Sequence, residues 1–387
     1  MIGMSAVIFI PDDTAKTGYP QPLMLQSVMG APLLAWLANA LFDSGVGRFF
    51  LVCHDRYAEA ARACLPAEAE VMTTMDSDPA DLLHVFLSTA EDAEHTITVV
   101  TGPAVYLPQL APQAAGRFPR VYGVSREELM QALDEHFSFA RFLLDNGSPM
   151  NEEQSMYSVA SPAELPEIAG LLQRNRLLAL ARTGVEIYDA ASCYVEPSVR
   201  VAPGARLLPG TMLRGKTVVG EEAVIGPWSV IDDSVIGARA VVNASQVRDS
   251  RVGQDAVVGP YASVRGGCEL GRSVRAGSFV ELKNARLGEN TQVPHLAYLG
   301  DTEAGANCNF GCGVATANFD RVQKHETVVG ENAFIGCNTA LIAPLQVGSG
   351  AYIGAGSTIT EDVPAQALGI ARARQSNKKE WAAKHKK

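Results

Sequence analysis

The sequence predicts an α/β domain followed by a parallel β-helix. The first observation is a six-residue period late in the chain, where an aliphatic residue recurs at every sixth position and a glycine often follows it. The longest run is Val329, Ile335, Leu341, Val347, Ile353 and Ile359, and shorter runs lie between residues 252–276 and 219–231. The second observation is an alternation of apolar strand-like runs with a helical pattern in the first hundred residues.

The six-residue period is typical of a solenoid. Each unit supplies one short strand and a tight corner, so three units make one triangular coil. A single coil cannot bury its aliphatic residues, whereas a stack of coils can. We therefore expect about ten coils of roughly 18 residues, because three hexapeptides close one coil.

The N-terminal pattern indicates a sheet with helices on its faces. Apolar runs at 4–10, 48–53 and 96–100 read as buried strands, and residues 32–44 have a helical pattern that ends at glycines. Strands that alternate with helices predict a parallel sheet. Ser125, which is followed by two glutamates, marks a further helix start.

Four segments follow from these patterns: an α/β domain over 1–160, a linker helix over 161–185, a β-helix over 186–365 and a basic tail over 366–387. Ser161 and Glu164 form a capping box before the amphipathic linker helix. The cationic residues of the tail are Arg372, Arg374, Lys378, Lys379, Lys384, Lys386 and Lys387.

Composition narrows the function classes. The 387 residues are 47% hydrophobic with a net charge of -10, which argues against nucleic acid as a partner because phosphate backbones bind broad basic faces. The sequence has neither a long uninterrupted apolar stretch nor the pattern of a signal peptide, so we expect no membrane insertion and a cytoplasmic location. Its seven scattered cysteines suit reduced thiols, and no metal site is expected.

The six-residue period fails between Val314 and Val329, where the sequence becomes polar and charged. Insertions that loop out of a solenoid commonly carry function. Residues 278–301, just upstream, also read as irregular and place a histidine, a glutamate, a lysine and a tyrosine within about one coil. We expect these two stretches to form the functional centre.

This region resembles the bifunctional N-acetylglucosamine-1-phosphate uridyltransferase / glucosamine-1-phosphate N-acetyltransferase family. The motifs that carry the resemblance are VELKNARLG, PHLAYLGD, CNFGCGVATANFDRVQKHETVVGENAFIG and GAGSTITEDVP, within a match from about residue 161 to residue 381. The resemblance implies a left-handed β-helix after a nucleotidyltransferase-like domain, and a homotrimer with active sites between subunits. It also implies acetyl-CoA-dependent acetylation of glucosamine-1-phosphate for UDP-N-acetylglucosamine and cell-wall precursor synthesis.

The resemblance assigns roles to residues on the acceptor side of this reaction. His295 matches the general base, which suits an imidazole that titrates near neutrality. Glu281 matches a carboxylate that orients the histidine or the amine. The cations that match the sugar-phosphate site are Arg265, Lys283 and Lys324, and the further sugar contacts are Tyr298 and Asn309.

On the donor side, the positions that match the acetyl-CoA site are Cys312, Asn318, Phe319, Cys337, Ala355 and Arg372. Three of them depart from the family, which commonly has alanine, tyrosine and serine where this chain has Cys312, Phe319 and Cys337. A thiol nucleophile is one interpretation of the two cysteines. A small apolar lining is the other, and it is favoured because acetylation of an amine needs no acyl-enzyme.

The N-terminal domain resembles a degenerate, shortened uridyltransferase. Where the family has a glycine-rich phosphate loop, this chain has Asp12 and Asp13, and Gln21 stands at an expected lysine. The family's magnesium-binding aspartate is replaced at Pro103. We therefore expect neither magnesium binding nor uridyltransferase activity, since carboxylates repel phosphates.

Two other functions stay open. The same fold could acetylate another amino sugar or a sugar nucleotide, or the β-helix could be a non-catalytic binding protein. A carbonic-anhydrase-like solenoid needs three zinc-binding histidines, and the repeat region offers only His295 and His325.

Overall fold

The computed structural model describes residues 4–74, 79–90, 95–110, 119–135, 139–150 and 155–385. The chain divides into two compact units, Met1–Arg182 with Val195–Pro197, and Thr183–Tyr194 with Ser198–Lys387. The segment boundaries predicted at 160, 185 and 365 remain an interpretation. Lys386 and Lys387 of the predicted basic tail lie outside the described residues.

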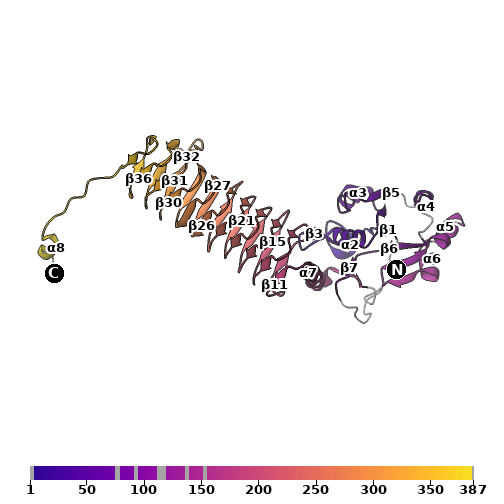
Figure 1. Cartoon of the computed structure of the whole chain (residues 1–387). Helices are drawn as coiled ribbons and strands as arrows, with labels where there is room; N and C mark the ends of the chain where they lie inside the picture. The colour runs from indigo at the N-terminus through magenta and orange to yellow at the C-terminus, as the bar shows by residue number, and fades with distance from the viewer. Residues whose placement is uncertain are drawn as a thin grey trace. The chain divides into compact units, whose positions relative to one another are not determined.

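A six-stranded sheet in the order β5-β4-β1-β6-β8-β9 forms the centre of the first unit (Figure 1). Its parallel strands are β1 (Ser5–Phe9), β4 (Arg48–Val52), β5 (Glu70–Thr74) and β6 (Thr96–Val100). Its antiparallel edge is formed by β8 (Val121–Ser125) and β9 (Ser148–Met150).

The three predicted strands are confirmed, but the prediction of a parallel sheet is wrong at this edge. There β8 runs opposite to β6 and β9 opposite to β8, an arrangement common at the margin of otherwise parallel sheets. The sequence between 107 and 160 lacks the clear alternation that reveals buried parallel strands.

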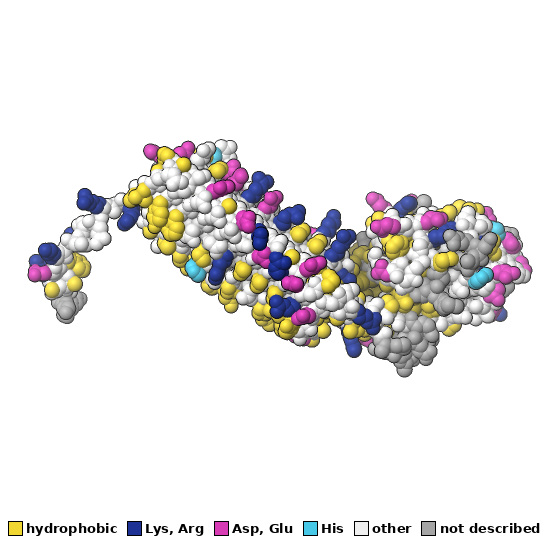
Figure 2. All heavy atoms as spheres, viewed as in Figure 1, with side chains coloured by type: hydrophobic (Ala, Val, Ile, Leu, Met, Phe, Trp, Pro, Cys, Tyr) yellow, Lys and Arg dark blue, Asp and Glu magenta, His cyan; other side chains and the backbone are white. Residues whose placement is uncertain are grey.

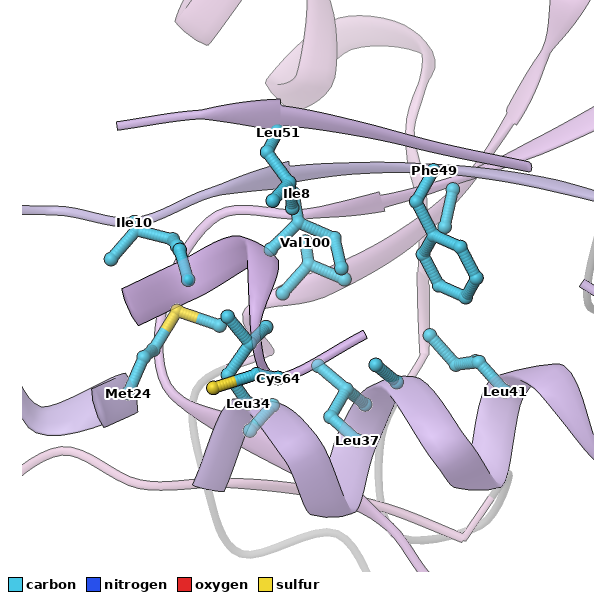
Figure 3. Packing of buried hydrophobic residues seen from close by; sticks show 14 of the residues in the cluster. Ile8, Ile10, Met24, Leu34, Leu37, Leu41, Phe49, Leu51, Cys64 and Val100 are labelled. Carbon is cyan, nitrogen blue, oxygen red and sulfur yellow. The ribbon is translucent and has the colours of Figure 1, made fainter. Parts of the chain in front are cut away.

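Helices cover both faces of the sheet. They are α2 (Leu33–Phe42), α3 (Asp55–Arg62), α4 (Ala80–Ser88), α5 (Arg126–Asp134) and α6 (Phe139–Asn146). Two further helices of this unit are α1 (Thr14–Thr17) and α7 (Leu165–Arg182). On one face Leu34 and Leu37 of α2 pack towards Ile8 and Leu51 (Figure 3). On the other face α4, α5 and α6 pack around Phe50.

Short elements complete the unit. They are two 3-10 turns (Leu23–Leu25 and Pro162–Glu164) and the strands β2 (Ser27–Val28), β3 (Ala31–Pro32), β7 (Ala104–Tyr106) and β10 (Met156–Ser158).

The two predicted helix starts differ in detail. Ser125 caps α5 as predicted, because its hydroxyl accepts a bond from the Glu128 N–H at 3.4 Å. Before α7 the capping box forms only in part: Glu164 accepts from the Ala160 N–H at 3.1 Å, while Ser161 makes no capping bond. The chain enters α7 through the turn Pro162–Glu164, and Ile168 and Leu172 then pack beside Trp36.

The second unit is a left-handed parallel β-helix with three faces, seen as successive stacked coils in Figure 1. Face 1 consists of β11 (Glu186–Ile187), β14 (Arg206–Leu207), β17 (Val224–Ile225), β20 (Val241–Val242), β23 (Val257–Val258), β26 (Arg275–Ser278), β28 (Gln292–His295), β30 (Asn309–Phe310), β33 (Phe334–Ile335), β36 (Tyr352–Ile353) and β38 (Leu368–Gly369).

The other two faces share one continuous sheet, because two long strands turn from one face onto the next. Face 2 contains β12 (Tyr194–Val195), β15 (Met212–Arg214), β18 (Val230–Asp232), β21 (Gln246–Arg248), β24 (Ser263–Arg265), β31 (Ala315–Ala317), β34 (Ala340–Ile342) and β37 (Thr358–Ile359). Face 3 contains β13 (Arg200–Val201), β16 (Val218–Val219), β19 (Val235–Ile236), β22 (Arg251–Val252), β25 (Glu269–Leu270), β32 (Thr327–Val329) and β35 (Leu345–Val347). The two long strands are β27 (Glu281–Leu287) and β29 (Tyr298–Ala304).

The interior of the β-helix alternates aliphatic and small residues. Val264 and Leu282 are fully buried, and the residue two positions before each of them, Ala262 or Val280, is buried as well. Full burial of one such aliphatic side chain contributes about 1.5–3 kcal/mol. The predicted hexapeptide core is therefore confirmed.

Coil length explains why the period looks irregular at residues 278–301. Hydrogen bonds between neighbouring coils join residues 16, 17 or 18 positions apart. A coil shorter than 18 residues shifts the six-residue frame without disturbing the stack. Residues 278–301 are therefore regular β-helix, and the prediction of irregular structure there is wrong.

The corner between faces 2 and 3 uses left-handed backbone at Asp and Asn. Asp233, Asp249, Asn284 and Asp301 have φ of 43°, 46°, 49° and 47°. Asp and Asn tolerate this conformation better than other residues with side chains. The corners can therefore carry polar side chains where glycine would carry none.

Charges along the β-helix alternate in sign, as Figure 2 shows on its visible face. Arg214 pairs with Asp232, which also contacts Arg248 at 3.3 Å, and Arg239 pairs with Asp255 at 2.8 Å. These pairs neutralise much of the basic charge locally.

Beyond β38 the tail is exposed and ends in α8 (Trp381–Lys384). Among the helices of the described residues, none has the length and apolarity that a membrane span requires.

We predict that Phe310→Ala lowers the stability of the β-helix by about 3–5 kcal/mol, because it leaves a cavity among stacked aliphatic residues. Thermal unfolding followed by circular dichroism measures the effect. The matched control is Phe334→Ala, which removes a ring that is 37% exposed on the next coil of the same face. Equal losses in the two variants would contradict the description of the core.

Candidate functional site

The candidate residues converge on the outside of face 2, where β24, β27 and β29 stack. In register, Arg265 lies beside Lys283, and Glu281 lies beside Tyr298. Because side chains alternate along a strand, these residues point outwards around the buried Leu282. The pleat therefore collects the predicted side chains from separate coils on one surface.

Glu281 forms an ion pair with Arg265, not with the predicted base His295. The Arg265 Nη2 contacts the Glu281 Oε1, and each side chain is 41% exposed. Across the described part of the chain, no hydrogen bond or ion pair joins Glu281 to His295. An exposed pair of this kind contributes about 0–1 kcal/mol, so a phosphate can compete for the Arg265 guanidinium.

Lys283 and Lys324 form the centre of a cation cluster. The nearby Lys324 ammonium, by hydrogen bonding and by charge, lowers the pKa of Lys283, and Arg265 acts in the same direction. A bound anion would therefore favour the charged form of Lys283. This arrangement supports phosphate recognition through charge-assisted hydrogen bonds.

A loop over residues 318–326 delivers Lys324 to this cluster, where the broken period predicts an insertion. Phe319 and Lys324 pair as an antiparallel bridge at its base. Asp320 closes the tip by accepting bonds from the Val322 and Gln323 N–H groups and from the His325 ring, all at 2.7 Å. These bonds hold the pKa of the Asp320 carboxyl well below its usual range.

Two further residues of this face were not predicted from the sequence, Gly300 and Asp301. A side chain at Gly300 would place its first carbon 2.4 Å from the Tyr298 hydroxyl and 2.8 Å from the Asn318 Nδ2. Asp301 accepts hydrogen bonds from Asn318 Nδ2 and, at 2.7 Å, from Asn284 Nδ2. The sequence could have indicated both residues, because they follow Tyr298 by two and three positions in the motif YLGD.

Asp301 therefore fixes which way the Asn318 amide points. With its Nδ2 held by the carboxylate, the Oδ1 of Asn318 is left as the acceptor for other groups. Asn318 is 7% exposed, so its orientation depends on this bond more than on solvent.

His295 occupies the corner between faces 1 and 2. It ends β28, stacks in register on Ser278 and is exposed. Asn309 lies on face 1 in β30, in register with Gln292 of β28, the strand that ends at His295. The candidate base thus stands at the edge of the face that carries the cations, with Tyr298 three residues further along the chain.

The predicted donor residues divide between two edges of face 2. Cys312, Cys337 and Ala355 follow one another along the His295 corner: the Asn338 N–H donates to the Cys312 carbonyl, and the Gly356 N–H to the Cys337 carbonyl, both at 2.7 Å. Arg372 adjoins this corner, since its Cδ lies 3.8 Å from the Cβ position of Gly356. Asn318 and Phe319 lie at the opposite edge.

In the first unit, the loop after β1 is closed by its own acidic side chains. Asp12 accepts a bond from the Thr14 hydroxyl at 2.7 Å and contacts Arg56, while Asp13 accepts from the Leu23 N–H at 3.0 Å. The bond from Thr14 is the main reason that the pKa of Asp12 is lowered. The loop therefore presents carboxylates where the resemblance expects a phosphate.

Comparison with known proteins bears on the family of the chain. The family model described as "Bacterial transferase hexapeptide (six repeats)" matches residues 326–361. The chain is also 42% identical over 240 residues to the bifunctional protein GlmU of Clostridium perfringens, across 62% of this chain and 53% of that protein. This chain is similar to the bifunctional GlmU proteins over about half of their length.

Other GlmU proteins give the same result and confirm the family resemblance. The protein from Caldicellulosiruptor saccharolyticus is 48% identical over 203 residues, covering 52% of this chain and 44% of its own length. The protein from Brevibacillus brevis is 43% identical over 233 residues, covering 60% and 50%. The chain thus spans about half the length of the GlmU relatives that it matches.

We predict that Lys324→Met weakens binding of inorganic phosphate about tenfold or more, because one charge-assisted hydrogen bond contributes about 1.5–3 kcal/mol. Isothermal titration calorimetry at low ionic strength measures this change. The control is Lys216→Met, an exposed lysine on a distant coil. Unchanged affinity in Lys324→Met would contradict the cation cluster as a phosphate site.

Proposed function

We propose that this chain transfers the acetyl group of acetyl-CoA to the amine of glucosamine-1-phosphate, supplying N-acetylglucosamine-1-phosphate for UDP-N-acetylglucosamine and cell-wall precursors. The observation that carries the proposal is the convergence of Arg265, Lys283 and Lys324 on a face whose edge holds His295. A sugar phosphate offers an anion to the cations and an amine to the base. The relationship to GlmU proteins supports the same acceptor.

Each residue has a role in this reaction. His295, as a neutral imidazole, accepts the proton that the sugar nitrogen loses as its new amide bond forms. The cations hold the phosphate and so orient the amine, while Tyr298 and Asn309 contact the sugar. Glu281 offsets the Arg265 charge until the phosphate arrives, which replaces the orienting role that the sequence suggests for it.

Small side chains along one corner leave room for the acetyl donor. When bound, acetyl-CoA supplies the acetyl group as a thioester. Cys312, Cys337 and Ala355 leave room beside His295, and Arg372 would pair with the nucleotide phosphates. Asn318 and Phe319 contribute from the other edge of face 2.

We further propose a homotrimer with active sites between subunits. Within one chain the donor residues lie at two opposite edges of face 2. In a trimer, one edge of a subunit would meet the other edge of its neighbour, so that the two groups of donor residues would form one site. An apolar ridge supports this assembly, because Trp228, Tyr261, Phe279 and Leu296 are 56–72% exposed along the corner of His295. The Tyr261 and Phe279 rings stack at 5.2 Å, and an exposed apolar ridge of this kind marks an interaction surface.

We propose that uridyltransferase activity is lost. Asp12 and Asp13 fill the loop after β1 with carboxylates that bond within the loop, so an incoming nucleotide phosphate meets negative charge. Pro103 offers no carboxylate for magnesium after β6.

Acetylation of another amino sugar or a sugar nucleotide is the nearest alternative, and a binding protein without catalysis is the next. The cation cluster favours a terminal sugar phosphate over a sugar nucleotide, whose phosphates lie between two groups. In the following experiment, turnover with glucosamine-1-phosphate separates the proposed reaction from both alternatives.

We predict that the protein releases thiol from acetyl-CoA with glucosamine-1-phosphate and that His295→Ala slows this release about 100-fold or more, since general bases contribute about 10²–10⁴-fold. A thiol-release assay measures the rates, with His84→Ala as the variant control and glucosamine-6-phosphate as the control acceptor. No turnover from folded protein would reject the proposed reaction, and undiminished turnover in His295→Ala would reject the base.

We also predict that Asp301→Asn raises the KM for substrates about tenfold, because an asparagine cannot accept hydrogen bonds from Asn284 and Asn318 as two carboxylate oxygens do. Asparagine keeps the left-handed corner, so the fold should persist. Asp249→Asn changes the same corner on another coil and serves as the control. Equal kinetics in the two variants would show that Asp301 is a corner residue only.

A further inference from the structure

Two cysteines, Cys312 and Cys337, stand on neighbouring coils at one corner of the β-helix. The Gly311 N–H donates to the Ile335 carbonyl at 2.8 Å and the Asn338 N–H donates to the Cys312 carbonyl at 2.7 Å. These bonds flank the two cysteines and place them side by side in the stack. Both thiols are free.

These thiols are also the accessible ones. The other five cysteines are buried, and burial raises the pKa of each of their thiols, that of Cys64 to about 11. Cys312 is half-buried and Cys337 is exposed. A reagent in solution therefore meets Cys312 and Cys337 before the rest.

The geometry of the corner suits a disulfide. Neighbouring strands stand about 4.8 Å apart, within the Cα separation of about 4.4–6.8 Å that disulfides need. The Cys337 Sγ lies 2.9 Å from the Cβ position of Gly311, the residue before Cys312. Both cysteines lie in turns, where the pleat does not hold their side chains apart.

We propose that Cys312 and Cys337 form a dithiol modification site that a peroxide converts into a disulfide between coils. The Cys337 thiolate attacks one oxygen of hydrogen peroxide, so that an S–O bond forms, the O–O bond breaks and hydroxide leaves. The Cys312 thiolate then attacks the oxidised sulfur, forming the S–S bond and releasing a second hydroxide. Two sulfurs are oxidised and, with two protons, the peroxide becomes two waters.

This site does not depend on the proposed acetyl transfer. The family that the chain resembles commonly has alanine and serine at these positions, so the thiol pair is a departure of this sequence. The disulfide would bridge the two ends of the segment that contains loop 318–326 and Lys324. It would also lie on the corner that continues from His295.

The test treats the reduced full-length protein with hydrogen peroxide, alkylates the remaining thiols in denaturant with N-ethylmaleimide and measures intact mass. We expect the wild type to lose two of its seven alkylatable thiols without gaining oxygen, and a non-reduced digest to contain the peptide pair joined through Cys312 and Cys337. Dithiothreitol should restore both thiols.

The matched variants are Cys312→Ala and Cys337→Ser, which install the residues common in the family and should fold normally. Neither should form an intramolecular disulfide, and in Cys312→Ala the remaining Cys337 should gain oxygen instead. The proposal is overturned if the wild type keeps seven alkylatable thiols or if its lost thiols appear as sulfinic acid. It is equally overturned if the joined peptides contain other cysteines.

Discussion

The stacking of one coil upon the next in register is the constraint on which this structure depends. Each face of a coil buries an aliphatic residue in most coils, usually beside a small one, so neighbouring coils meet with similar shapes and their backbone hydrogen bonds form along each face. The burial of these residues stabilises the β-helix, and its cysteines are free thiols. Residues at the surface are consequently free to vary.

That freedom explains where the chemical groups lie. Face 2 contributes Arg265, Lys283 and Tyr298 from strands, while His295, Asp301 and loop 318–326 lie at its two edges. A strand fixes the direction of its side chains through the pleat, and a corner tolerates insertion because its backbone faces solvent. The cation cluster draws on a strand and on an insertion, since Lys283 comes from a strand and Lys324 from an inserted loop.

The sequence predicted the β-helix, and it named most of the candidate residues that lie on or beside face 2, because the period and the motifs are local patterns. It did not predict that Glu281 pairs with Arg265 or that Asp301 holds Asn318, because these contacts join residues 16 and 17 positions apart and depend on the length of each coil. The shortened coils likewise made residues 278–301 look irregular. The antiparallel edge of the first unit escaped prediction because β8 and β9 carry no distinctive alternation.

In-register stacking also fixes the distances between side chains on different coils. Functional groups on different coils can be separated along the axis only by whole numbers of strand spacings, each about 4.8 Å. Three consecutive coils place Arg265, Lys283 and Gly300 in register, one strand spacing apart. A substitution that moves a cation from one coil to the next would therefore shift its charge by about 4.8 Å along the axis rather than by a small increment.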